Sequence, residues 1–394
     1  MQIRVARRLQ ELGGYAFAEV DRAVEQLRAQ GIEPIDLGVG DPSDPTPEPI
    51  RRACQQAVER HAASGYPSYA GSPAFRAAVA EWTRRRFGIE LDPQTEITSS
   101  LGSKEAIFHV AEALVEPGEI VLCPSPGYPP YARGARFAEA QPWFYPLRPE
   151  NGFLPELEAI PPEVAARARL LWINYPNSPT GRVASLAELE RIAAWARARG
   201  IVLCSDEPYS EIYFTEEPPP SALQCGKEGV LVFQSLSKRS HMTGYRVGWV
   251  AGDARLVAAL RRLKTNIDSG TPWFIQDAAI AALGDEEHVA RARASYRARR
   301  DALLEGLAAA GLEPCPPEGT FYVWQRLPAG LSSVEFARRL LAPQIAVVCT
   351  PGAWLGEPLA DGTHPGEGYV RFALVAPLER IQEAARRLAA LRLR

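Results

Sequence analysis

One lysine of this chain stands where covalent chemistry is plausible on physical grounds. Lys238 lies in the stretch VFQSLSKRSHMTGYRVGW, directly after an apolar run and next to a serine. The chain has 44 lysine and arginine residues, of which only Lys104, Lys227, Lys238 and Lys264 are lysines. A lysine amine can lose its proton and attack a carbonyl carbon, whereas a guanidinium stays charged. Lys238 is therefore a candidate nucleophile, and a solvated surface charge is the ordinary alternative.

Further polar side chains follow apolar runs that have the character of strands. The runs at 170–173, 201–204 and 230–233 lead into NYPN, SDEPY and SLSK, and a run at 97–99 leads into GSK. In an open parallel sheet, ligands bind beyond the carboxyl ends of the strands, so we expect these side chains along one edge. The candidates at that edge are Gly102, Ser103, Lys104, Asn177, Asp206, Tyr209, Ser235, Ser237 and Lys238.

This set of groups matches the parts of pyridoxal 5'-phosphate. A helix N-terminus at 102–104, the two serine hydroxyls and the guanidinium of Arg246 can bind a phosphate. The carboxylate of Asp206 can keep a pyridine nitrogen protonated, which makes the ring an electron sink. Lys238 can condense with the aldehyde and afterwards carry a proton to or from a substrate carbon.

Three more side chains complete the predicted cofactor site. Asn177 and Tyr209 can donate hydrogen bonds to the phenolate oxygen of the ring, and Tyr128 in PSPGYPPY can stack on its face. Each residue has an ordinary alternative: turn chemistry for Asn177, packing for Tyr128 and a salt bridge for Asp206. Their joint occurrence at strand ends favours the cofactor.

The region from 95 to 284 predicts the frame that positions these groups. Short apolar strands alternate there with amphipathic stretches, including a helix over 185–199 that stops at Gly200. This pattern is typical of an α/β fold with a mainly parallel sheet between two layers of helices. After Gly284, helical stretches and the antiparallel-looking strands GTFYVWQRL, IAVVCTPG and GYVRFALV predict a smaller α+β domain.

The N-terminal segment is expected to join this smaller domain. Residues up to about 31 carry an apolar stripe at helical spacing, formed by Tyr15, Phe17, Val20, Val24 and Leu27. The proline-rich loop PIDLGVGDPSDPTPEPI follows. We therefore divide the chain into an N-terminal arm at 1–45, a large cofactor-binding domain at 46–284 and a small domain at 285–394.

Composition argues against several other classes of protein. Of the 394 residues, 46% are hydrophobic and the formal net charge is −3, which gives no electrostatic reason to expect nucleic acid or an anionic membrane as partner. The first residues lack an uninterrupted apolar stretch, so we expect no secretory signal, and without an apolar run of about eighteen residues we expect no membrane span. The six cysteines are scattered without a CxxC pair, which favours buried thiols over disulfides or a metal site. A cytoplasmic protein is expected.

The order of the motifs makes the chain similar to a known family. The segments LGVGDPSDPTP, YPSYAGSPAFR, GSKEA, PSPGYPPY, NYPNSPTG, SDEPYSEI, SLSKRSHMTGYRVGW and YVRFAL follow one another over essentially the whole length. In this order they resemble the pyridoxal-phosphate-dependent aminotransferases of fold type I, class I/II. The resemblance implies transfer of an amino group between an amino acid and a 2-oxo acid, and a homodimer with active sites at the subunit interface.

The resemblance also implies roles for individual residues. Lys238 matches the lysine that bonds to the cofactor, and Asp206 matches the partner of the pyridine nitrogen. The matches to the phenolate and phosphate ligands are Asn177, Tyr209, Ser235, Ser237 and Arg246, and Tyr66 matches a tyrosine that reaches the phosphate of the neighbouring subunit. Arg371 in YVRFAL matches the arginine that binds the substrate α-carboxylate bidentately. The further expected substrate contacts are Gly40, Asn177 and Tyr15.

The expected substrate belongs to the diaminopimelate type. The segments YAFAEVDRAVEQLRAQGIEPIDLGVGDPSDPTPEPI and SLSKRSHMTGYR resemble most the family branch that acts on such substrates. Because PPEGTFYVW resembles the strand of general aminotransferases, we expect an N-succinyl-LL-diaminopimelate transaminase with 2-oxoglutarate as amino acceptor. The alternatives with the same cofactor are a general aspartate, alanine or aromatic aminotransferase, and a β-lyase or decarboxylase.

Two alternatives come from other classes of protein. The segment 235–238 fits the S-x-x-K pattern of penicillin-recognising serine enzymes, but the chain contains no KTG motif and its Ser235 follows an apolar strand. A cofactor-binding regulator would need an added DNA-binding module, and the helix expected before residue 31 is too short to provide one.

Overall fold

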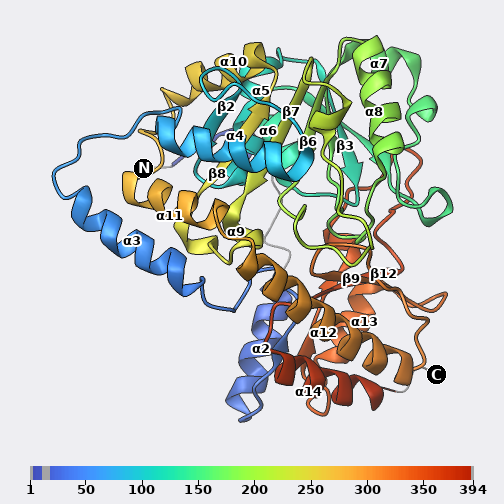
Figure 1. Ribbon diagram of the computed structural model, residues 1–394. Helices are drawn as coiled ribbons and strands as arrows, with labels where there is room; N and C mark the ends of the chain where they lie inside the picture. The colour runs from blue at the N-terminus through green and yellow to red at the C-terminus, as the bar shows by residue number, and fades with distance from the viewer. Residues whose placement is uncertain (1–2, 11–17, 392–394) are drawn as a thin grey trace.

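A seven-stranded sheet forms the centre of the protein, whose computed structural model describes residues 3–10 and 18–391 (Figure 1). Its strands are β2 (Ile97–Ser100), β3 (Ile120–Ser125), β4 (Gln141–Pro146), β5 (Ala168–Ile173), β6 (Val202–Asp206), β7 (Val230–Ser235) and β8 (Gly248–Gly252). They lie in the order β2-β8-β7-β6-β5-β3-β4. The expected mainly parallel sheet is confirmed, and β4 at its edge is a strand that the sequence pattern did not indicate.

Strand direction brings the predicted site residues to one edge of the sheet. Strands β3 to β7 pair in parallel, whereas β8 is antiparallel to both of its neighbours, β7 and β2. Strand β2 therefore runs in the same direction as β5, β6 and β7. The start of β8 meets the carboxyl ends of these strands, which places Arg246 beside the segment that follows β7.

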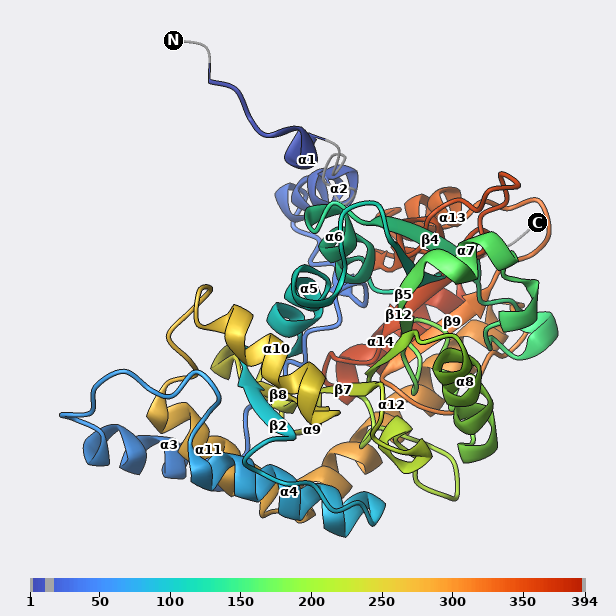
Figure 2. The same cartoon turned by 90° about the horizontal axis from the view of Figure 1, so that it is seen from above.

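Helices cover both faces of the sheet (Figure 2). The helices of this part are α3 (Glu48–Arg60), α4 (Pro73–Phe87), α5 (Ser103–Leu114), α6 (Pro130–Phe137), α7 (Pro162–Arg167), α8 (Leu186–Ala198), α9 (Leu236–Arg239), α10 (Ala254–Lys264) and α11 (Trp273–Leu283). Helices α4, α8 and α11 pack on one face, and α5, α6 and α10 pack on the other. Successive strand residues alternate between these two cores, since Leu171 belongs to the first and Leu170 and Trp172 to the second.

Local sequence signals set the ends of these helices. The hydroxyl of Ser185 accepts a hydrogen bond from the backbone N–H of Glu188, whose side chain in turn accepts from the N–H of Ser185. This reciprocal capping starts α8 one residue after the predicted position. At α4 the hydroxyl of Ser72 alone caps the helix, by accepting from the backbone N–H of Phe75, and the helix ends at Gly88, which takes the left-handed conformation with φ of 71°.

A second, smaller unit lies below the seven-stranded sheet in Figure 1. Its elements are α2 (Ala18–Ala29), β1 (Ile35–Asp36), α12 (Glu287–Ala309), β9 (Tyr322–Arg326), α13 (Ser333–Leu340), β10 (Val347–Val348), β11 (Thr350–Pro351), β12 (Tyr369–Ala373) and α14 (Leu378–Ala389). Strands β11, β12 and β9 form an antiparallel sheet, and β1 pairs in parallel with β10. The pairing of β1 brings the start of the chain to its C-terminal part, while the exact domain boundaries remain predictions.

Two expectations about the N-terminal region have different outcomes. Helix α2 contains Val20 and Leu27, both buried, as the apolar stripe predicts. Tyr15 and Phe17 lie outside the described residues. The short helix α1 (Arg7–Gln10) precedes them. Across residues 3–10 and 18–391, no helix combines the length and apolar character that crossing a bilayer requires.

The contact between α12 and α14 depends on a glycine. A Cβ atom on Gly306 would lie 2.5 Å from the Cα and 2.6 Å from the Cβ of Ala385 on α14. These distances are shorter than van der Waals contact, so the two helices can only approach this closely without a side chain at 306. The smaller unit owes part of its core to this approach.

We predict that Gly306→Ala destabilises the protein by about 1–3 kcal/mol, because overpacking outweighs the better helix propensity of alanine. The measurement is the free energy of unfolding in urea. Gly284→Ala is the matched control, because its Cβ would meet no atom closer than 3.6 Å in a helical backbone. Equal stability of the two variants would show that α12 and α14 are not tightly packed.

Candidate active site

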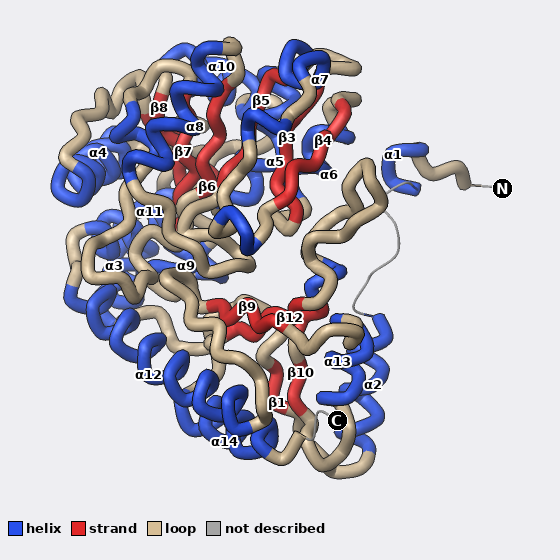
Figure 3. The backbone as a smooth tube through the Cα atoms, turned by 90° about the vertical axis from the view of Figure 1, so that its right-hand side faces the viewer, coloured by secondary structure: helices blue, strands red, loops and turns tan. Residues whose placement is uncertain are grey.

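A cavity of about 360 Å³ opens at the carboxyl edge of the large sheet, where the smaller unit meets it. Figure 3 shows β9 and β12 below that edge. The wall contains eleven of the residues predicted from sequence: Gly40, Ser103, Lys104, Tyr128, Asp206, Tyr209, Ser235, Ser237, Lys238, Arg246 and Arg371. Side chains separated by hundreds of residues thus share one enclosure.

Lys238 is held at the cavity by the short helix α9, which begins directly after β7. Its Nζ donates a hydrogen bond of 2.6 Å to the carbonyl oxygen of Gly40. Its Nζ also lies 5.4 Å from the centroid of the Phe321 ring. Burial lowers the pKa of the Lys238 amine, because the charged form loses hydration. An amine in this state gives up its proton more readily than a solvated lysine does.

Asp206 ends β6 and is 4% exposed. Its Oδ2 accepts a hydrogen bond of 2.6 Å from the hydroxyl of Tyr131, whereas its Oδ1 is buried without a partner among the described residues. Burial raises the pKa of the carboxyl to about 7, and the hydrogen bond from Tyr131 opposes this shift. The carboxylate therefore has one oxygen fixed by the protein and one available to a ligand.

Hydroxyls and one guanidinium surround the other end of the cavity. Ser235 caps α9 and donates a hydrogen bond of 2.9 Å to the hydroxyl of Ser237. Arg246 has φ of 54°, and its Nη1 donates to the carbonyl of Thr243 at 2.7 Å. A Cβ on Gly102 would lie 2.5 Å from Arg246 Nη2, so glycine is required for this approach. With the N-terminus of α5 beside them, these groups form an anion cradle.

The smaller unit contributes a second cationic group. Arg371 on β12 donates from Nη2 to the carbonyl of Gly38 at 3.0 Å, and its Nε is buried without a partner among the described residues. Its guanidinium carbon lies 4.2 Å from the centroid of the Tyr322 ring on β9. The guanidinium is therefore fixed in orientation and keeps donor capacity for a carboxylate.

Two tyrosines complete the wall of the cavity. Tyr209 is buried, and its hydroxyl lies 3.4 Å from the hydroxyl of Tyr322. Burial raises the pKa of Tyr209, so its hydroxyl stays protonated and can donate. Tyr128 packs edge-on against Tyr131, with ring centroids 5.7 Å apart. The ring of Tyr128 is 37% exposed and available for stacking with a planar ligand.

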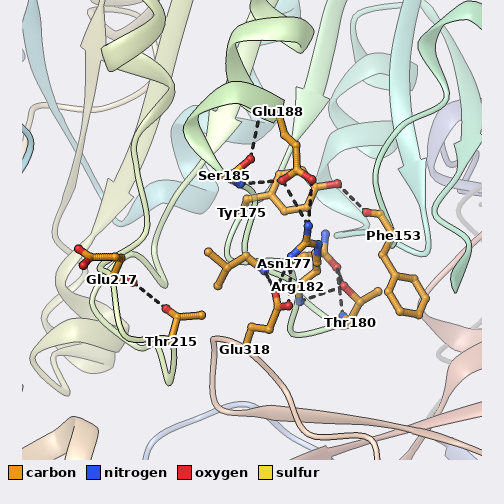
Figure 4. Close-up of polar contacts among 11 residues, drawn as sticks. Phe153, Tyr175, Asn177, Thr180, Arg182, Ser185, Glu188, Thr215, Glu217 and Glu318 are labelled. Carbon is orange, nitrogen blue, oxygen red and sulfur yellow. Dashed lines mark hydrogen bonds and ion pairs between the residues drawn. The ribbon is translucent and has the colours of Figure 1, made fainter. Parts of the chain in front are cut away.

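Asn177 and Tyr66 lie outside this cavity wall, and their predicted roles remain predictions. Asn177 is buried but does not line the cavity, because its side chain binds the carbonyl of Asn174 and both polar groups of Thr180 within its own turn (Figure 4). Its neighbour Ser178 lines the cavity instead. Tyr66 lies outside this cavity and is 87% exposed, so its predicted role at a neighbouring subunit remains a prediction. Tyr15 lies outside the described residues.

Sequence reasoning missed several contributors. Tyr131 stacks on Trp172 with centroids 4.5 Å apart and orients Asp206, yet the motif PSPGYPPY contains two tyrosines and pointed to the first. Tyr322 in GTFYVW alternates along a strand, which is the pattern of an ordinary core residue. The wall also includes Asp41, Asn174, Pro208 and Thr243. Asn174 could have been identified from the sequence, because a polar residue directly after an apolar strand is a signal for a position at this edge of the sheet.

Comparison with known proteins agrees with this geometry. A family model described as aminotransferase class I and II matches residues 32–388. The chain belongs to the class I and II aminotransferases, and the expected enzyme class, fold type and cofactor are thereby confirmed.

Individual relatives and solved structures show which members of the family the chain resembles. The chain is 46% identical over 389 residues to the LL-diaminopimelate aminotransferase of Aquifex aeolicus, covering 98% of both chains. Among solved structures, substrate-bound BacF from Bacillus subtilis is similar, with a TM-score of 0.91, 32% identity and coverage of 99% and 98%. A probable N-succinyldiaminopimelate aminotransferase from Thermus thermophilus has a TM-score of 0.88, 34% identity and coverage of 96% and 100%.

The residues of the cavity fit pyridoxal 5'-phosphate. The buried, unpartnered Oδ1 of Asp206 requires a donor, and a protonated pyridine nitrogen is one. The anion cradle suits a phosphate, and the amine of Lys238 lies on the wall of the same cavity. The donor set therefore matches the three polar ends of this cofactor.

We predict that the cofactor-free protein loses stability as pH rises from about 4 through about 7. A carboxyl whose folded-state pKa is raised from 3.8 to about 7 binds more protons when folded, so its stabilising contribution disappears over this interval. Asp206→Asn should flatten part of this slope, and Glu207, also raised to about 7, should retain the rest. The measurement is the urea midpoint against pH, and an unchanged slope in Asp206→Asn would contradict a desolvated carboxylate.

Proposed function

We propose that Lys238, Asp206 and Arg371 together carry out amino transfer in this enzyme. The observation that supports this is their convergence on one cavity from β12, from the end of β6 and from the helix that follows β7. One group is an amine of lowered pKa, one is an acid with a free oxygen, and one is a guanidinium with free donors. These are the groups that amino transfer on an amino acid requires.

Each residue has a distinct task. Bound pyridoxal 5'-phosphate supplies an aldehyde that accepts the amino group and a ring that stabilises negative charge at the substrate α-carbon. Asp206 keeps the ring nitrogen protonated through its Oδ1. Arg371 binds the substrate α-carboxylate and fixes its orientation. The Nζ of Lys238 takes the proton from the α-carbon, and its lowered pKa leaves the amine more often unprotonated than a solvated lysine.

The amino donor that we propose is LL-diaminopimelate, with 2-oxoglutarate as acceptor. Relatives at 41–46% identity over nearly the whole chain carry the name LL-diaminopimelate aminotransferase. The neighbour named for the N-succinyl substrate is 34% identical. We therefore replace the N-succinyl donor expected from sequence with the unmodified one.

The cavity wall offers groups for the distal end of such a donor. Lys104 and Asp41 both line the cavity and are exposed to it, with opposite charges. LL-diaminopimelate ends in a carboxylate and an ammonium, whereas succinylation removes the ammonium and adds bulk. Among the charged side chains of the wall, the oppositely charged pair Lys104 and Asp41 suits the unmodified end better.

We further propose that the enzyme is a cytoplasmic homodimer. Tyr66 is 87% exposed on one chain, which is unusual for a large aromatic side chain. A neighbouring subunit would cover Tyr66 and bring its hydroxyl toward that subunit's anion cradle.

Lys238→Ala should abolish amino transfer and the visible absorbance of bound cofactor, because it removes the amine that bonds to the cofactor. The other lysine of the described wall is Lys104. Lys238→Arg is the matched control for charge, since arginine keeps the cation and cannot act as a base. Turnover within about tenfold of wild type in Lys238→Ala would refute the assignment. The measurement is stopped-flow or steady-state conversion of 2-oxoglutarate to glutamate.

Among amino donors, LL-diaminopimelate should give a kcat/KM at least about tenfold above that of N-succinyl-LL-diaminopimelate, aspartate, alanine and aromatic amino acids. Asp41→Asn should lower this preference while it leaves kcat/KM for alanine nearly unchanged, since alanine has no distal end. A higher kcat/KM for the succinylated donor would restore the expectation drawn from sequence.

A further inference from the structure

We infer that Lys264 is a positioning residue of the anion cradle: it holds Glu105 beside the loop that precedes α5 and neutralises the charge that Glu105 would otherwise present to the cofactor phosphate. Lys264 lies outside the wall of the cavity, so it acts on the cradle through Glu105. The inference rests on the assignment of the cradle to the cofactor phosphate, and it is independent of which amino acid is the donor.

Lys264 occupies a position that is rare for a lysine. It is the last residue of α10 and is only 4% exposed. Its Nζ donates to Oε2 of Glu105 at 3.3 Å and to Oδ2 of Asp268 at 2.5 Å, and both of these side chains are themselves largely buried. An ammonium at such a site loses most of its hydration, and the two carboxylates replace the lost water.

Glu105 connects this lysine to the loop of the cradle. It lies in the first turn of α5, and its Oε2 accepts a hydrogen bond of 3.1 Å from the backbone N–H of Leu101. The carbonyl of Leu101 accepts in turn from Nη2 of Arg246 at 3.3 Å. The backbone of Leu101 is therefore held at its N–H by Glu105 and at its carbonyl by Arg246. This fixes the path of the chain to Ser103, which lines the cavity.

The position of Glu105 creates an electrostatic conflict with anion binding. The N-cap residue of α5 is Gly102, which has no side chain to accept from the first N–H groups of the helix. These groups are left for a ligand such as phosphate, but a carboxylate in the same turn repels that ligand. An ammonium in contact with the carboxylate offsets the repulsion, while the carboxylate keeps its hydrogen bond to Leu101.

The packing of the helices brings the ammonium to this carboxylate. Helices α5 and α10 lie on the same face of the large sheet and share one hydrophobic core (Figure 2). Lys264 stands at the C-terminal end of α10, where the partial negative charge of the helix dipole also favours a cation. The three donors of an ammonium can point to acceptors on different segments, which suits two carboxylates that come from different parts of the chain.

The second carboxylate connects Lys264 to another segment. Asp268 follows α10, and its Oδ1 accepts from the backbone N–H of Gly270 at 2.6 Å. A Cβ atom on Gly270 would lie 2.6 Å from the carbonyl oxygen of Ser68, so this turn packs directly on the backbone two residues after Tyr66. Lys264 thus fixes both the start of α5 and the turn that lies against Ser68.

The test compares binding of pyridoxal 5'-phosphate and of pyridoxal, which lacks the phosphate, to the cofactor-free protein. Lys264→Met should weaken binding of the phosphorylated compound about tenfold and leave binding of pyridoxal within about twofold of wild type. A merely structural role would weaken both equally, so the readout is the ratio of the two dissociation constants. Lys227→Met is the matched control, because Lys227 pairs with Glu96 away from the cavity wall, and it should bind both compounds like wild type.

Glu105→Gln tests the same inference with Lys264 in place. Glutamine keeps an oxygen that can accept from the N–H of Leu101, but it removes the negative charge beside the cradle. The cofactor-free variant should therefore bind inorganic phosphate about threefold more tightly than wild type, measured by competition with pyridoxal 5'-phosphate.

A phosphate-specific loss in Lys264→Met and a gain of phosphate affinity in Glu105→Gln both support the inference. Equal loss for the two compounds in Lys264→Met, or wild-type affinity for the phosphorylated one, would overturn it. Weaker phosphate binding by Glu105→Gln would also overturn it, whether or not Lys264→Met folds. Equal affinity of the wild-type protein for the two compounds would overturn the cradle together with this inference. Because no amino donor is present, a wrong donor under the proposed function cannot produce any of these results.

Discussion

A carboxylate that is removed from water remains an anion only if donors or cations replace its lost hydration. Asp206 receives one such donor, the hydroxyl of Tyr131, and its other oxygen is left without a partner among the described residues. The raised pKa of the carboxyl, about 7, expresses this deficit. A protonated pyridine nitrogen supplies both the missing donor and the missing charge. The missing hydrogen-bond partner of one buried carboxylate oxygen thus connects the fold to the cofactor.

The surroundings of Asp206 explain why the cofactor can be held in one orientation. Tyr131 is itself fixed by stacking on Trp172, with an interplanar angle of 14°. The backbone carbonyl of Asp206 is fixed by the amide of Asn174. The phosphate cradle lies on the β7 side because β8 runs against its neighbours and brings Arg246 to the same edge. One reversed strand therefore lets three separate segments meet around one anion.

Sequence reasoning succeeded where chemistry follows strand order. The carboxyl ends of parallel strands must share an edge, so the convergence of Asp206, Ser235 and Lys238 could be predicted from apolar runs alone. Strand β4 was not predicted because Pro142 and Pro146 interrupt its strand pattern. Proline is tolerated in this strand because it lies at the edge of the sheet. The pattern also predicted the antiparallel strands of the smaller unit, which the structure confirms.

The position of Asn177 could not have been predicted from its type. An amide in a turn can bind a ligand or its own backbone, and only the geometry of the turn decides which. Adjacent residues of the turn differ in this respect: Asn177 satisfies its amide internally, and Ser178 lines the cavity. Tyr322 was missed for a related reason, since a strand residue facing a ligand and one facing a core follow the same alternation.

The two units of the protein hold different partners in the reaction. The large sheet carries the acid, the amine and the anion cradle, whereas the smaller unit carries Arg371 and Tyr322 on β12 and β9. The hydrogen bond from Lys238 to the carbonyl of Gly40 joins them across the cavity. A lysine bonded to the cofactor can no longer donate as an ammonium, so this link weakens when the cofactor is bound. Under the proposed role of Arg371, its contact with the substrate carboxylate would then set the position of the smaller unit and couple the placement of the substrate to its recognition.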